Sequence, residues 1–348
     1  MVVAEIARWL SDVSGDDTTA RIVDVRKPDA AGSSHSVTFV TAQFDAHGRS
    51  VVRDLVLRRD PDELALFVDA DLGRDAELMR RLHRLATLPV PEVIGFNPDA
   101  TVLGTPYIVI AKVPGAVASD NPSYNSSGWL ADAAPTQRRA IWQRAVQLMS
   151  RVTTVDPGAI DDLFPDRRGL HAELAHWHRN LLWAADGSPS PTIDAAWHHL
   201  SASVPPDTSA ALSWGDARIR NVIFDAGNPA AIIDWEMASL GGAHLDIGWW
   251  LMTDLVHSTQ MGCTRLDGLG TRSETIQAWC AATGLEAETI EWHEAFAALK
   301  LGVTIGRVTN VSHRRGRLPK ELLAMAEDNF GTRILAQLLP VPPPRRGG

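Results

Sequence analysis

Side chains that could bind a metal ion and accept a proton gather between residues 214 and 234. Asp216 and Asn221 share the segment WGDARIRN, and Asp234 ends the apolar run AAIID further along the chain. Carboxylate and amide oxygens suit Mg²⁺, and a second carboxylate can orient a hydroxyl and accept its proton. Arg218 adds a planar cation for a transferring phosphoryl group. These residues supply what in-line phosphoryl transfer requires: a base, two metal ligands and a positive group.

The stretch NVIFDAGNPAAIID, which joins Asn221 to Asp234, predicts a β-hairpin because two apolar runs flank a turn. With Gly227 and Asn228 as the central turn residues, Asn221 faces Asp234 across the ladder. Opposed residues in a ladder have Cα atoms about 4.5 to 5.5 Å apart. We therefore expect the amide and the carboxylate to lie side by side at the open end of the hairpin.

The elements before this hairpin are rich in strand patterns. Two β-rich runs around the turn AHGR predict an antiparallel hairpin over residues 36–59. The segment DAELMRRLHRLA predicts an amphipathic helix with its leucines on one face. Strand character returns over residues 107–113 and ends at a Pro-Gly pair. We expect residues 1–113 to form an N-terminal domain with one antiparallel sheet and one main helix.

Beyond Pro114 the pattern changes from strand to helix. The polar segment SDNPSYNSSGWLADAAP has the length of a functional lid, and Trp129 within it is a candidate substrate contact. Helical spacing follows in TQRRAIWQRAVQLMSRV, in HAELAHWHRNLLWA and after Ser273 and Glu286. We expect residues 114–340 to form a mainly helical domain and residues 341–348 a flexible tail. The expected fold class is α+β with two lobes.

Charge and composition exclude several classes of protein. The 33 basic and 42 acidic residues give a net charge of −9, which favours neither nucleic acid nor an anionic membrane as a partner. Two cysteines are too few for a disulfide framework, and no apolar run reaches the roughly 18 residues of a membrane span. The N-terminus MVVAEIARWLSDV reads as an amphipathic helix rather than a signal peptide. We expect a cytoplasmic monomer or homodimer.

The catalytic stretch also resembles a known family. WGDARIRN followed by IIDWE is similar to the HGD-x4-N loop and the metal-binding aspartate of the aminoglycoside phosphotransferase and choline kinase superfamily. The resemblance implies a bilobal protein-kinase-like fold, with Asp216 as the catalytic base and Asn221 and Asp234 as Mg²⁺ ligands. Trp214 stands where the family has His. The segment GGAHLDIGWW resembles the family's G-D-P-x-x-D-L, which implies that Asp246 braces the catalytic loop.

The resemblance extends into the N-terminal domain. LVLRRDP is similar to the strand with the family's phosphate-gripping Lys, which implies that Arg58 binds the nucleotide and that Glu77 is its ion-pair partner. TPYIVIAKVPG resembles the strand that leads to the adenine-binding hinge, which implies main-chain contacts from Ala111 and Val113. The loop AAGSSHSVTF corresponds to the phosphate loop, and the residues it implies as phosphate ligands are Ser33, Ser34 and His35.

The function expected from these features is phosphoryl transfer from ATP, with GTP not excluded, to a hydroxyl of a small molecule in the presence of Mg²⁺. The resemblance implies an acceptor that is antibiotic-like, a sugar, an amino alcohol or a hydroxyacyl metabolite. The lid is chiefly neutral, which favours a neutral or acyl-type acceptor over a polycation. The alternative is a catalytically weakened, kinase-like nucleotide-binding regulatory module, because Arg58, Trp214 and the single glycine of the phosphate loop depart from the family pattern.

Overall fold

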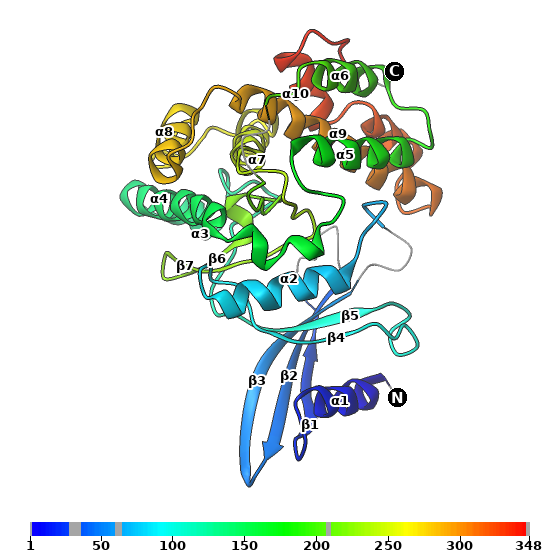
Figure 1. The fold of residues 1–348 in the computed structure, drawn as a ribbon, viewed down its shortest axis with the longest axis vertical. Coiled ribbons are helices and arrows are strands. Elements are labelled where there is room, and N and C mark those ends of the chain that lie inside the picture. Colours follow the sequence, from blue (N-terminus) through cyan, green and yellow to red (C-terminus); the bar gives the residue numbers. More distant parts are fainter. Residues whose placement is uncertain (1, 28–35, 60–64, 207–209, 346–348) are drawn as a thin grey trace. The chain divides into compact units, whose positions relative to one another are not determined.

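The structure, a computed structural model, describes residues 2–27, 36–59, 65–206 and 210–345. The chain divides into two compact units (Figure 1). Met1–Ala65 and Asp69–Pro114 form the first unit, whereas Leu66–Val68 and Gly115–Gly348 form the second. The first unit holds an antiparallel sheet and the second is mainly helical, so the predicted α+β fold class is confirmed.

The sheet of the first unit has five strands in the order β1-β2-β3-β5-β4. Its strands are β1 (Thr19–Arg26), β2 (Ser36–Ala46), β3 (Arg49–Arg59), β4 (Val93–Asn97) and β5 (Tyr107–Ala111). The predicted hairpin over residues 36–59 is confirmed as β2 and β3. Its turn residues, His47 and Gly48, both have positive φ, the geometry that matches the natural twist of two antiparallel strands.

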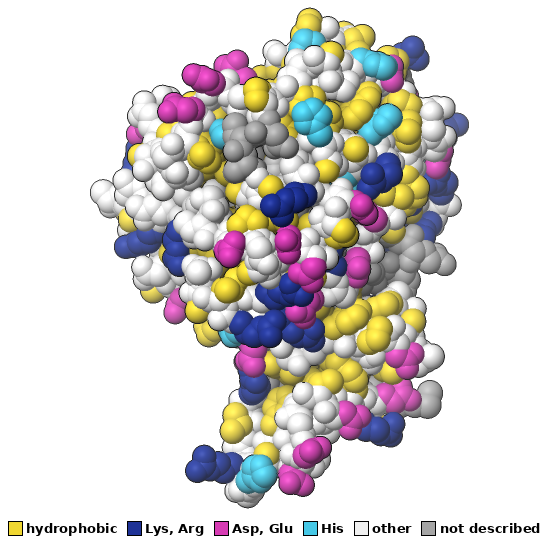
Figure 2. Space-filling model, viewed as in Figure 1, with side chains coloured by type: hydrophobic (Ala, Val, Ile, Leu, Met, Phe, Trp, Pro, Cys, Tyr) yellow, Lys and Arg dark blue, Asp and Glu magenta, His cyan; other side chains and the backbone are white. Residues whose placement is uncertain are grey.

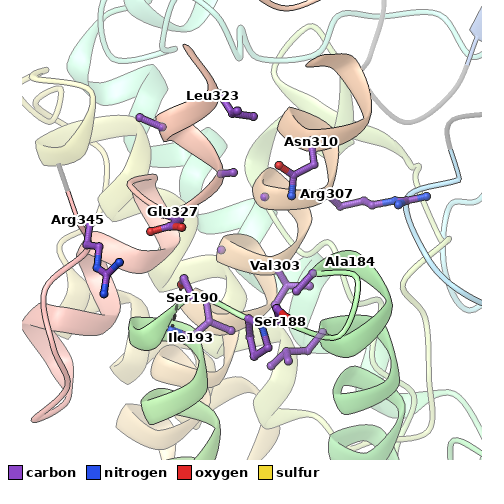
Figure 3. Close-up of a pocket in the computed structure, with 17 residues that line it drawn as sticks. Ala184, Ser188, Ser190, Ile193, Val303, Arg307, Asn310, Leu323, Glu327 and Arg345 are labelled. Atoms are coloured by element: carbon purple, nitrogen blue, oxygen red, sulfur yellow. Dashed lines mark hydrogen bonds between the residues drawn. The ribbon is translucent and has the colours of Figure 1, made fainter. Parts of the chain in front are cut away.

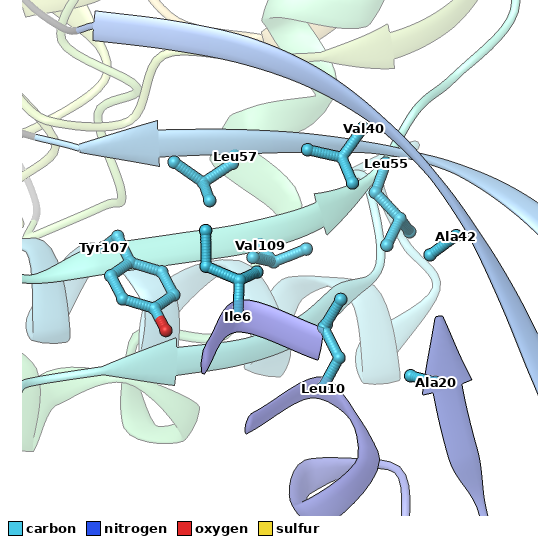
Figure 4. Packing of buried hydrophobic residues seen from close by; sticks show 9 residues of the cluster. All are labelled: Ile6, Leu10, Ala20, Val40, Ala42, Leu55, Leu57, Tyr107 and Val109. Carbon is cyan, nitrogen blue, oxygen red and sulfur yellow. The ribbon is translucent and has the colours of Figure 1, made fainter. Parts of the chain in front are cut away.

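One face of this sheet is covered by helix α1 (Val2–Val13). Ile6 and Leu10 are the buried residues of α1, which accounts for the amphipathic pattern of the N-terminus. Figure 4 shows these side chains lying against apolar residues of the strands. The cluster they form consists of Ile6, Leu10, Ala20, Val40, Ala42, Leu55, Leu57, Tyr107 and Val109.

Helix α2 (Leu72–Leu85) is the main helix of the first unit. Asp71 caps its start, because the Asp71 carboxylate accepts hydrogen bonds from the main-chain N–H groups of Gly73 and Arg74. The helix ends at Leu85, and the capping residue Ala86 has a φ of 54°, in the left-handed region. Its buried face includes a charged residue, Asp75, among aliphatic side chains.

The second unit consists of helices and a small two-stranded sheet, β6 (Val222–Asp225) and β7 (Asn228–Ile232). Its helices are α3 (Trp129–Asp132), α4 (Pro135–Arg151), α5 (Leu170–Ala184), α6 (Pro191–Ala202), α7 (His244–Leu255), α8 (Arg272–Thr283), α9 (Ile290–Arg314) and α10 (Phe330–Leu338). Helices α7 and α9 pack closely because Gly248 has no side chain: a Cβ there would lie 2.6 Å from the main chain of His293. A π-helical turn, Val256–Gln260, follows α7.

Across the described ranges, none of the helices combines the length and the apolar character needed to span a bilayer. The face drawn in Figure 2 carries acidic and basic side chains next to one another rather than a broad field of one sign. The final segment is partly fixed, because the Thr192 hydroxyl donates a hydrogen bond to the carbonyl of Pro342.

Candidate active site

The loop that carries Asp216 is held against a neighbouring segment by a close main-chain contact. Gly215 has a φ of 91°, and a Cβ at this position would lie 2.3 Å from the carbonyl oxygen of Met237. Only glycine fits such an approach without moving the backbone. The side chain of Asp216 is buried, so the loop presents its carboxylate inside the second unit rather than to bulk solvent.

Three donors surround the carboxylate of Asp216. The Asn221 amide donates to Oδ2 over 2.6 Å, and the indole N–H of Trp249 donates to Oδ1 over 2.6 Å. The Nε atom of Arg218 lies 3.0 Å from Oδ1 and forms an ion pair. The structure thus brings together the predicted base, the predicted cation and one predicted metal ligand, and it adds Trp249, which the sequence reasoning missed.

The position of Trp249 had a signal in the sequence. Trp249 follows Asp246 by three residues in α7, and residues at this spacing share a helix face. A helix that places Asp246 against the catalytic loop therefore directs Trp249 toward the same loop. The resemblance drew attention to Asp246 alone.

The orientation of Asn221 leaves one atom for a cation. Its Nδ2 atom donates to Oδ2 and to the main-chain carbonyl of Asp216, at 2.6 and 3.1 Å. A carboxylate and a carbonyl accept only, so both must face the amide nitrogen of Asn221. The amide oxygen of Asn221 is then the atom that can bind a metal ion.

The predicted register of the hairpin is wrong by one residue at the open end and by two residues next to the turn. Val222 pairs with Ile232 rather than Ile233, so Asn221 does not face Asp234 across the ladder. The turn residues are Ala226 and Gly227, with φ of 45° and 77°, and a register shift follows at Phe224, which pairs with Pro229. Proline has no N–H for the ladder, and strands tolerate it at such irregularities.

The segment of Asp234 is nevertheless bonded to the catalytic loop through the main chain. The carbonyl of Asn221 accepts a hydrogen bond from the N–H of Ile233 over 3.0 Å, and Asp234 follows with a φ of 66°. Aspartate tolerates this left-handed conformation better than most residues. The negative charge of Asp234 raises the pKa of both Asp216 and Arg218. Asn221 and Asp234 each carry a side-chain oxygen of the kind that Mg²⁺ prefers as a ligand.

The environment of Asp216 sets its proton affinity. Burial raises the pKa of Asp216, and the negative charge of Asp234 raises it further. Arg218 and the hydrogen bonds from Trp249 and Asn221 oppose this rise. A carboxyl whose proton affinity is raised by burial yet kept in place by donors suits general base catalysis.

Trp214, which stands where the resembling family has His, links the two halves of the site. Its indole is buried, and its Nε1 donates to the carbonyls of Ile233 and Asp234 at 2.9 and 3.1 Å. The side chain therefore ties the loop of Asp216 to the segment of Asp234. This contact gives the substitution of His by Trp a structural role in the geometry of the loop.

Asp246 braces the catalytic loop, as the resemblance implied. Its carboxylate accepts hydrogen bonds from the Ser213 hydroxyl and from the N–H groups of Trp214 and Gly215, at 2.7, 2.9 and 2.9 Å. Burial raises the pKa of Asp246 to about 6, while these three donors oppose the rise. At neutral pH the acceptor-only carboxylate is therefore the form that fits its surroundings.

We expect Asp246→Asn to destabilise the protein by about 1 to 3 kcal/mol, because the new amide N–H₂ faces a main-chain or hydroxyl donor and leaves it unpaired. Urea unfolding at pH 7.5 measures this change. The matched control is Asp225→Asn, since Asp225 is exposed at the hairpin end. Equal free energies of unfolding for the two variants would mean that Asp246 does not brace the loop.

Asp120, in the predicted lid, contacts three nitrogen-bearing side chains near Asp216. Asp120 Oδ1 lies 3.4 Å from Arg218 Nη1 and 3.0 Å from His257 Nε2, and Asp120 Oδ2 lies 3.3 Å from Arg220 Nε. Burial opposes ionisation, but the His257 hydrogen bond and the two arginines hold the pKa of Asp120 well below its usual range. The lid residue Asp120 thus pairs with Nη1 of the Arg218 guanidinium, whereas Asp216 pairs with its Nε.

The lid itself is docked on the π-helical turn. The carbonyl of His257 accepts hydrogen bonds from the Ser123 hydroxyl and the Asn125 amide, at 2.5 and 3.0 Å. Trp129, the predicted substrate contact, donates its indole N–H to the carbonyl of Val117 over 2.8 Å. These hydrogen bonds hold the lid segment in place within the second unit.

We expect Asp120→Asn to lower kcat about tenfold, the effect of losing one charge-assisted hydrogen bond that orients Arg218. Steady-state kinetics with the best available acceptor measure this loss. Asp132→Asn, at the exposed aspartate of the same lid, is the matched control. If both variants lose activity equally, Asp120 has no special relation to Arg218.

In the first unit, Arg58 pairs with a different acid from the one expected. Arg58 Nη2 lies 3.8 Å from Asp75 Oδ2, and both side chains are largely buried. Glu77 instead forms ion pairs with Arg80 and Arg81, at 3.5 and 3.0 Å, so its predicted pairing with Arg58 is wrong. Residues two apart point to opposite faces of a helix, and it is Asp75 that lies on the buried face of α2.

The remaining residues predicted to bind the nucleotide differ in whether their main-chain groups already form hydrogen bonds. The N–H of Ala111 donates to the carbonyl of Glu92 over 2.8 Å, so it is already used within the unit. Over the described part of the chain, the main chain of Val113 makes no hydrogen bond to another main-chain group. The three predicted phosphate ligands lie outside the described residues; they are Ser33, Ser34 and His35.

A separate cavity of about 470 Å³ lies in the second unit, among α5, α6, α9 and the segment before α10. Figure 3 shows Ser190 and Ile193 on one side of it and Val303 and Asn310 on another. None of its lining residues belongs to the catalytic loop or to the set predicted from the sequence.

Solved structures with the same arrangement of elements define the class of fold. A protein from Ralstonia eutropha assigned to the aminoglycoside phosphotransferases matches 90% of this chain and 95% of its own, with a TM-score of 0.62 and 19% identity. A macrolide 2′-phosphotransferase from Brachybacterium faecium matches 98% and 99%, with a TM-score of 0.54 and 16% identity. The fold is therefore the bilobal, protein-kinase-like fold of small-molecule phosphotransferases.

The family follows from the sequence. The model of the phosphotransferase enzyme family matches residues 26–295, and the chain belongs to this family. Among curated proteins, acyl-CoA dehydrogenase family member 10 of Mus musculus is 26% identical over 84% of this chain, and 29% of its own length is covered. The probable acyl-CoA dehydrogenase IBR3 of Arabidopsis thaliana is 24% identical over 74% of this chain and 33% of its own. The chain thus spans about a third of these relatives.

Proposed function

We propose that the protein transfers the γ-phosphate of ATP to a hydroxyl of a small acyl compound, with Asp216 as the base. The observation that carries this proposal is the buried cluster in which Asn221, Trp249 and Arg218 all contact the carboxylate of Asp216. In a member of the phosphotransferase enzyme family, a carboxylate held in this way is the group that orients the attacking hydroxyl.

The roles of the other residues follow from their contacts. As the hydroxyl oxygen forms its bond to the γ-phosphorus and ADP leaves, the hydroxyl proton passes to Asp216. Arg218, held between Asp216 and Asp120, offers its guanidinium to the phosphoryl group. Asn221 and Asp234 would hold Mg²⁺, which neutralises charge on the nucleotide phosphates.

In the first unit, Arg58 is the candidate ligand for the nucleotide phosphates. Its ion pair with buried Asp75 supports this role, because an acidic partner fixes the direction of a guanidinium. The main chain of Val113 is the candidate contact for the purine. The solved ternary complex of an aminoglycoside phosphotransferase with ADP and hygromycin B, which has the same fold, supports nucleotide binding.

Two observations favour an acyl acceptor over an aminoglycoside. The carboxylate of Asp120 in the lid is already paired with Arg218, Arg220 and His257, so it is not available to a polycationic ligand. The curated relatives are named as acyl-CoA dehydrogenase family members, and this chain matches about a third of their length. A phosphotransferase region within such chains fits a hydroxylated acyl substrate.

Release of ADP in the presence of matched acceptor pairs tests this proposal. We expect a hydroxyacyl thioester to stimulate ADP release at least about tenfold over the background hydrolysis of ATP, whereas the same thioester without the hydroxyl should not. Kanamycin and a macrolide serve as competing acceptors. Stimulation by an antibiotic alone would overturn the acyl assignment, and no stimulation by any hydroxyl compound would overturn the enzymatic function.

A further inference from the structure

A buried lysine lies behind the catalytic loop. Lys300 in α9 is only 1% exposed, and its ammonium nitrogen lies over three aromatic rings. The distances to the ring centroids are 5.1 Å for Trp249, 5.3 Å for Trp177 and 5.5 Å for Phe296. We call Lys300 and these three rings the Lys300 cage. All of it lies within the second unit.

Two of the three rings are hydrogen-bond donors to buried carboxylates. The indole N–H of Trp249 donates to Asp216 Oδ1 over 2.6 Å, and that of Trp177 donates to Glu173 Oε1 over 3.0 Å. The same lysine therefore contacts two indoles, and each indole donates its N–H to a carboxylate. We call the hydrogen bond from Trp249 to Asp216 the Trp249 branch, and it reaches the proposed base. The hydrogen bond from Trp177 to Glu173 is the Trp177 branch, and Glu173 forms a buried ion pair with Arg167.

Burial of Lys300 disfavours its ammonium form, and nearby carboxylates offset only part of this effect. Burial lowers the pKa of Lys300, and the charge of Arg167 lowers it further. The negative charges of Glu173, Asp246 and Asp216 oppose this change. A buried cation is costly, and an apolar side chain of similar volume would often give equal or greater stability. Stability alone therefore gives no reason for a lysine at this position.

A cation over the face of an indole attracts the π electrons of the ring toward itself. The hydrogen of the indole N–H becomes more positive, so the N–H is a stronger donor. The effect on Trp249 is directed at one atom, Oδ1 of Asp216. A stronger hydrogen bond at this oxygen holds the carboxylate in a single orientation, and a base must be held in that way to align an attacking hydroxyl.

We propose that Lys300 is a positioning residue for Asp216 and acts through the indole of Trp249. This inference rests on the proposed function in one respect, namely that Asp216 is the base. It assigns a part in the reaction to α9, a helix that contributes no residue to the recognised motifs. Lys300 and Trp249 are both buried, so we expect them to affect the rate rather than the binding of ATP or acceptor.

Kinetics of single and double variants test the inference. We expect Lys300→Met and Trp249→Phe each to lower kcat about tenfold, with KM values for ATP and acceptor changed by less than about twofold. The double variant should be no slower than Trp249→Phe alone, since Lys300 acts only through that indole. Losses that multiply in the double variant, or an unchanged kcat in Lys300→Met, would overturn the inference.

The Trp177 branch supplies a matched control. Trp177→Phe removes an indole N–H from the same cage, but its partner is Glu173 rather than the base. We expect this variant to be less stable to urea while its kcat stays within about twofold of the wild type. A loss of kcat equal to that of Trp249→Phe would show that any damage to the cage has the same effect. Lys300→Gln is the second variant to be used if Lys300→Met does not fold.

A spectroscopic measurement tests the contact without any turnover. The indole ¹⁵N–¹H resonance of Trp249 is identified by its absence in Trp249→Phe. In Lys300→Met its proton should move upfield, because the hydrogen bond to Asp216 weakens. An unmoved resonance would refute the effect of Lys300 on Trp249. If the resonance moves but no hydroxyl compound is phosphorylated, the proposed function fails while the contact between Lys300 and Trp249 stands.

Discussion

Asp216→Asn is expected to lower kcat by about 10² to 10⁴-fold, the usual contribution of a general base. The new amide can accept a hydrogen bond from Trp249 but cannot take a proton from the attacking hydroxyl. Binding of Mg²⁺–ATP should change by less than about threefold, since Asp216 is not assigned as a ligand of the metal or the nucleotide. Steady-state kinetics and calorimetric titration with a non-hydrolysable ATP analogue measure the two effects.

The matched control for this variant is Asp225→Asn, at the exposed end of the same hairpin. Its kcat should equal that of the wild type. Retention of more than about a tenth of wild-type kcat by Asp216→Asn would remove Asp216 from the role of base. A loss of nucleotide binding in that variant would instead indicate that the loop had collapsed.

The second large effect is expected for Asp234→Asn, which removes the charged oxygen ligand proposed for Mg²⁺. We expect the Mg²⁺ concentration for half-maximal activity to rise at least about tenfold, and kcat at saturating Mg²⁺ to fall about 10² to 10³-fold. An amide carries no charge, and Mg²⁺ is bound through one or two carboxylates and its remaining waters and phosphates. Titration of activity with MgCl₂ at fixed ATP measures both quantities.

Asn221→Ala extends this test, because the amide oxygen of Asn221 is the other proposed ligand. It should also raise the required Mg²⁺ concentration, and the two effects should not add fully, since both residues serve one ion. An unchanged Mg²⁺ requirement in Asp234→Asn would place the metal elsewhere. Asp225→Asn again serves as the unaffected control.

Much of the fold could be predicted because its patterns are local. The β2–β3 hairpin follows from alternating apolar residues around a Gly-containing turn, and α1 follows from Ile6 and Leu10 at helical spacing. The N-cap of α2 at Asp71 was missed, so the helix begins earlier than the apolar pattern indicated. Element type depends on periodicity, whereas element ends depend on single capping contacts.

The register of the β6–β7 hairpin could not be read from sequence. Its turn places Ala226 in a left-handed conformation, although Gly227 and Asn228 are the residues that ordinarily adopt it. Pro229 then pairs opposite Phe224, where the register shifts. The expectation that Asn221 and Asp234 face each other was argued from this register and was wrong. Asn221 directly precedes β6 and Asp234 lies two residues after β7, so both still lie at the open end of the hairpin.

Long-range contacts account for the other differences. The choice of Asp75 rather than Glu77 as the partner of Arg58 depends on which face of α2 is buried against the sheet. The approach of Lys300 to Trp249 depends on the packing of α9 against α7, which no local pattern specifies. Trp214 could be predicted in part. The sequence shows that Trp214 stands where the family has His, and its two hydrogen bonds to the Asp234 segment explain why an indole fits there.

Direct detection of the product tests the central claim, that a hydroxyl compound is phosphorylated with Asp216 as the base. The ³¹P NMR spectrum of a reaction with ATP, Mg²⁺ and a hydroxyacyl thioester should show a new phosphate monoester that grows as ADP appears and is absent with Asp216→Asn. Nucleotide binding without a monoester, for any hydroxyl acceptor, would contradict the account and favour a regulatory nucleotide-binding module.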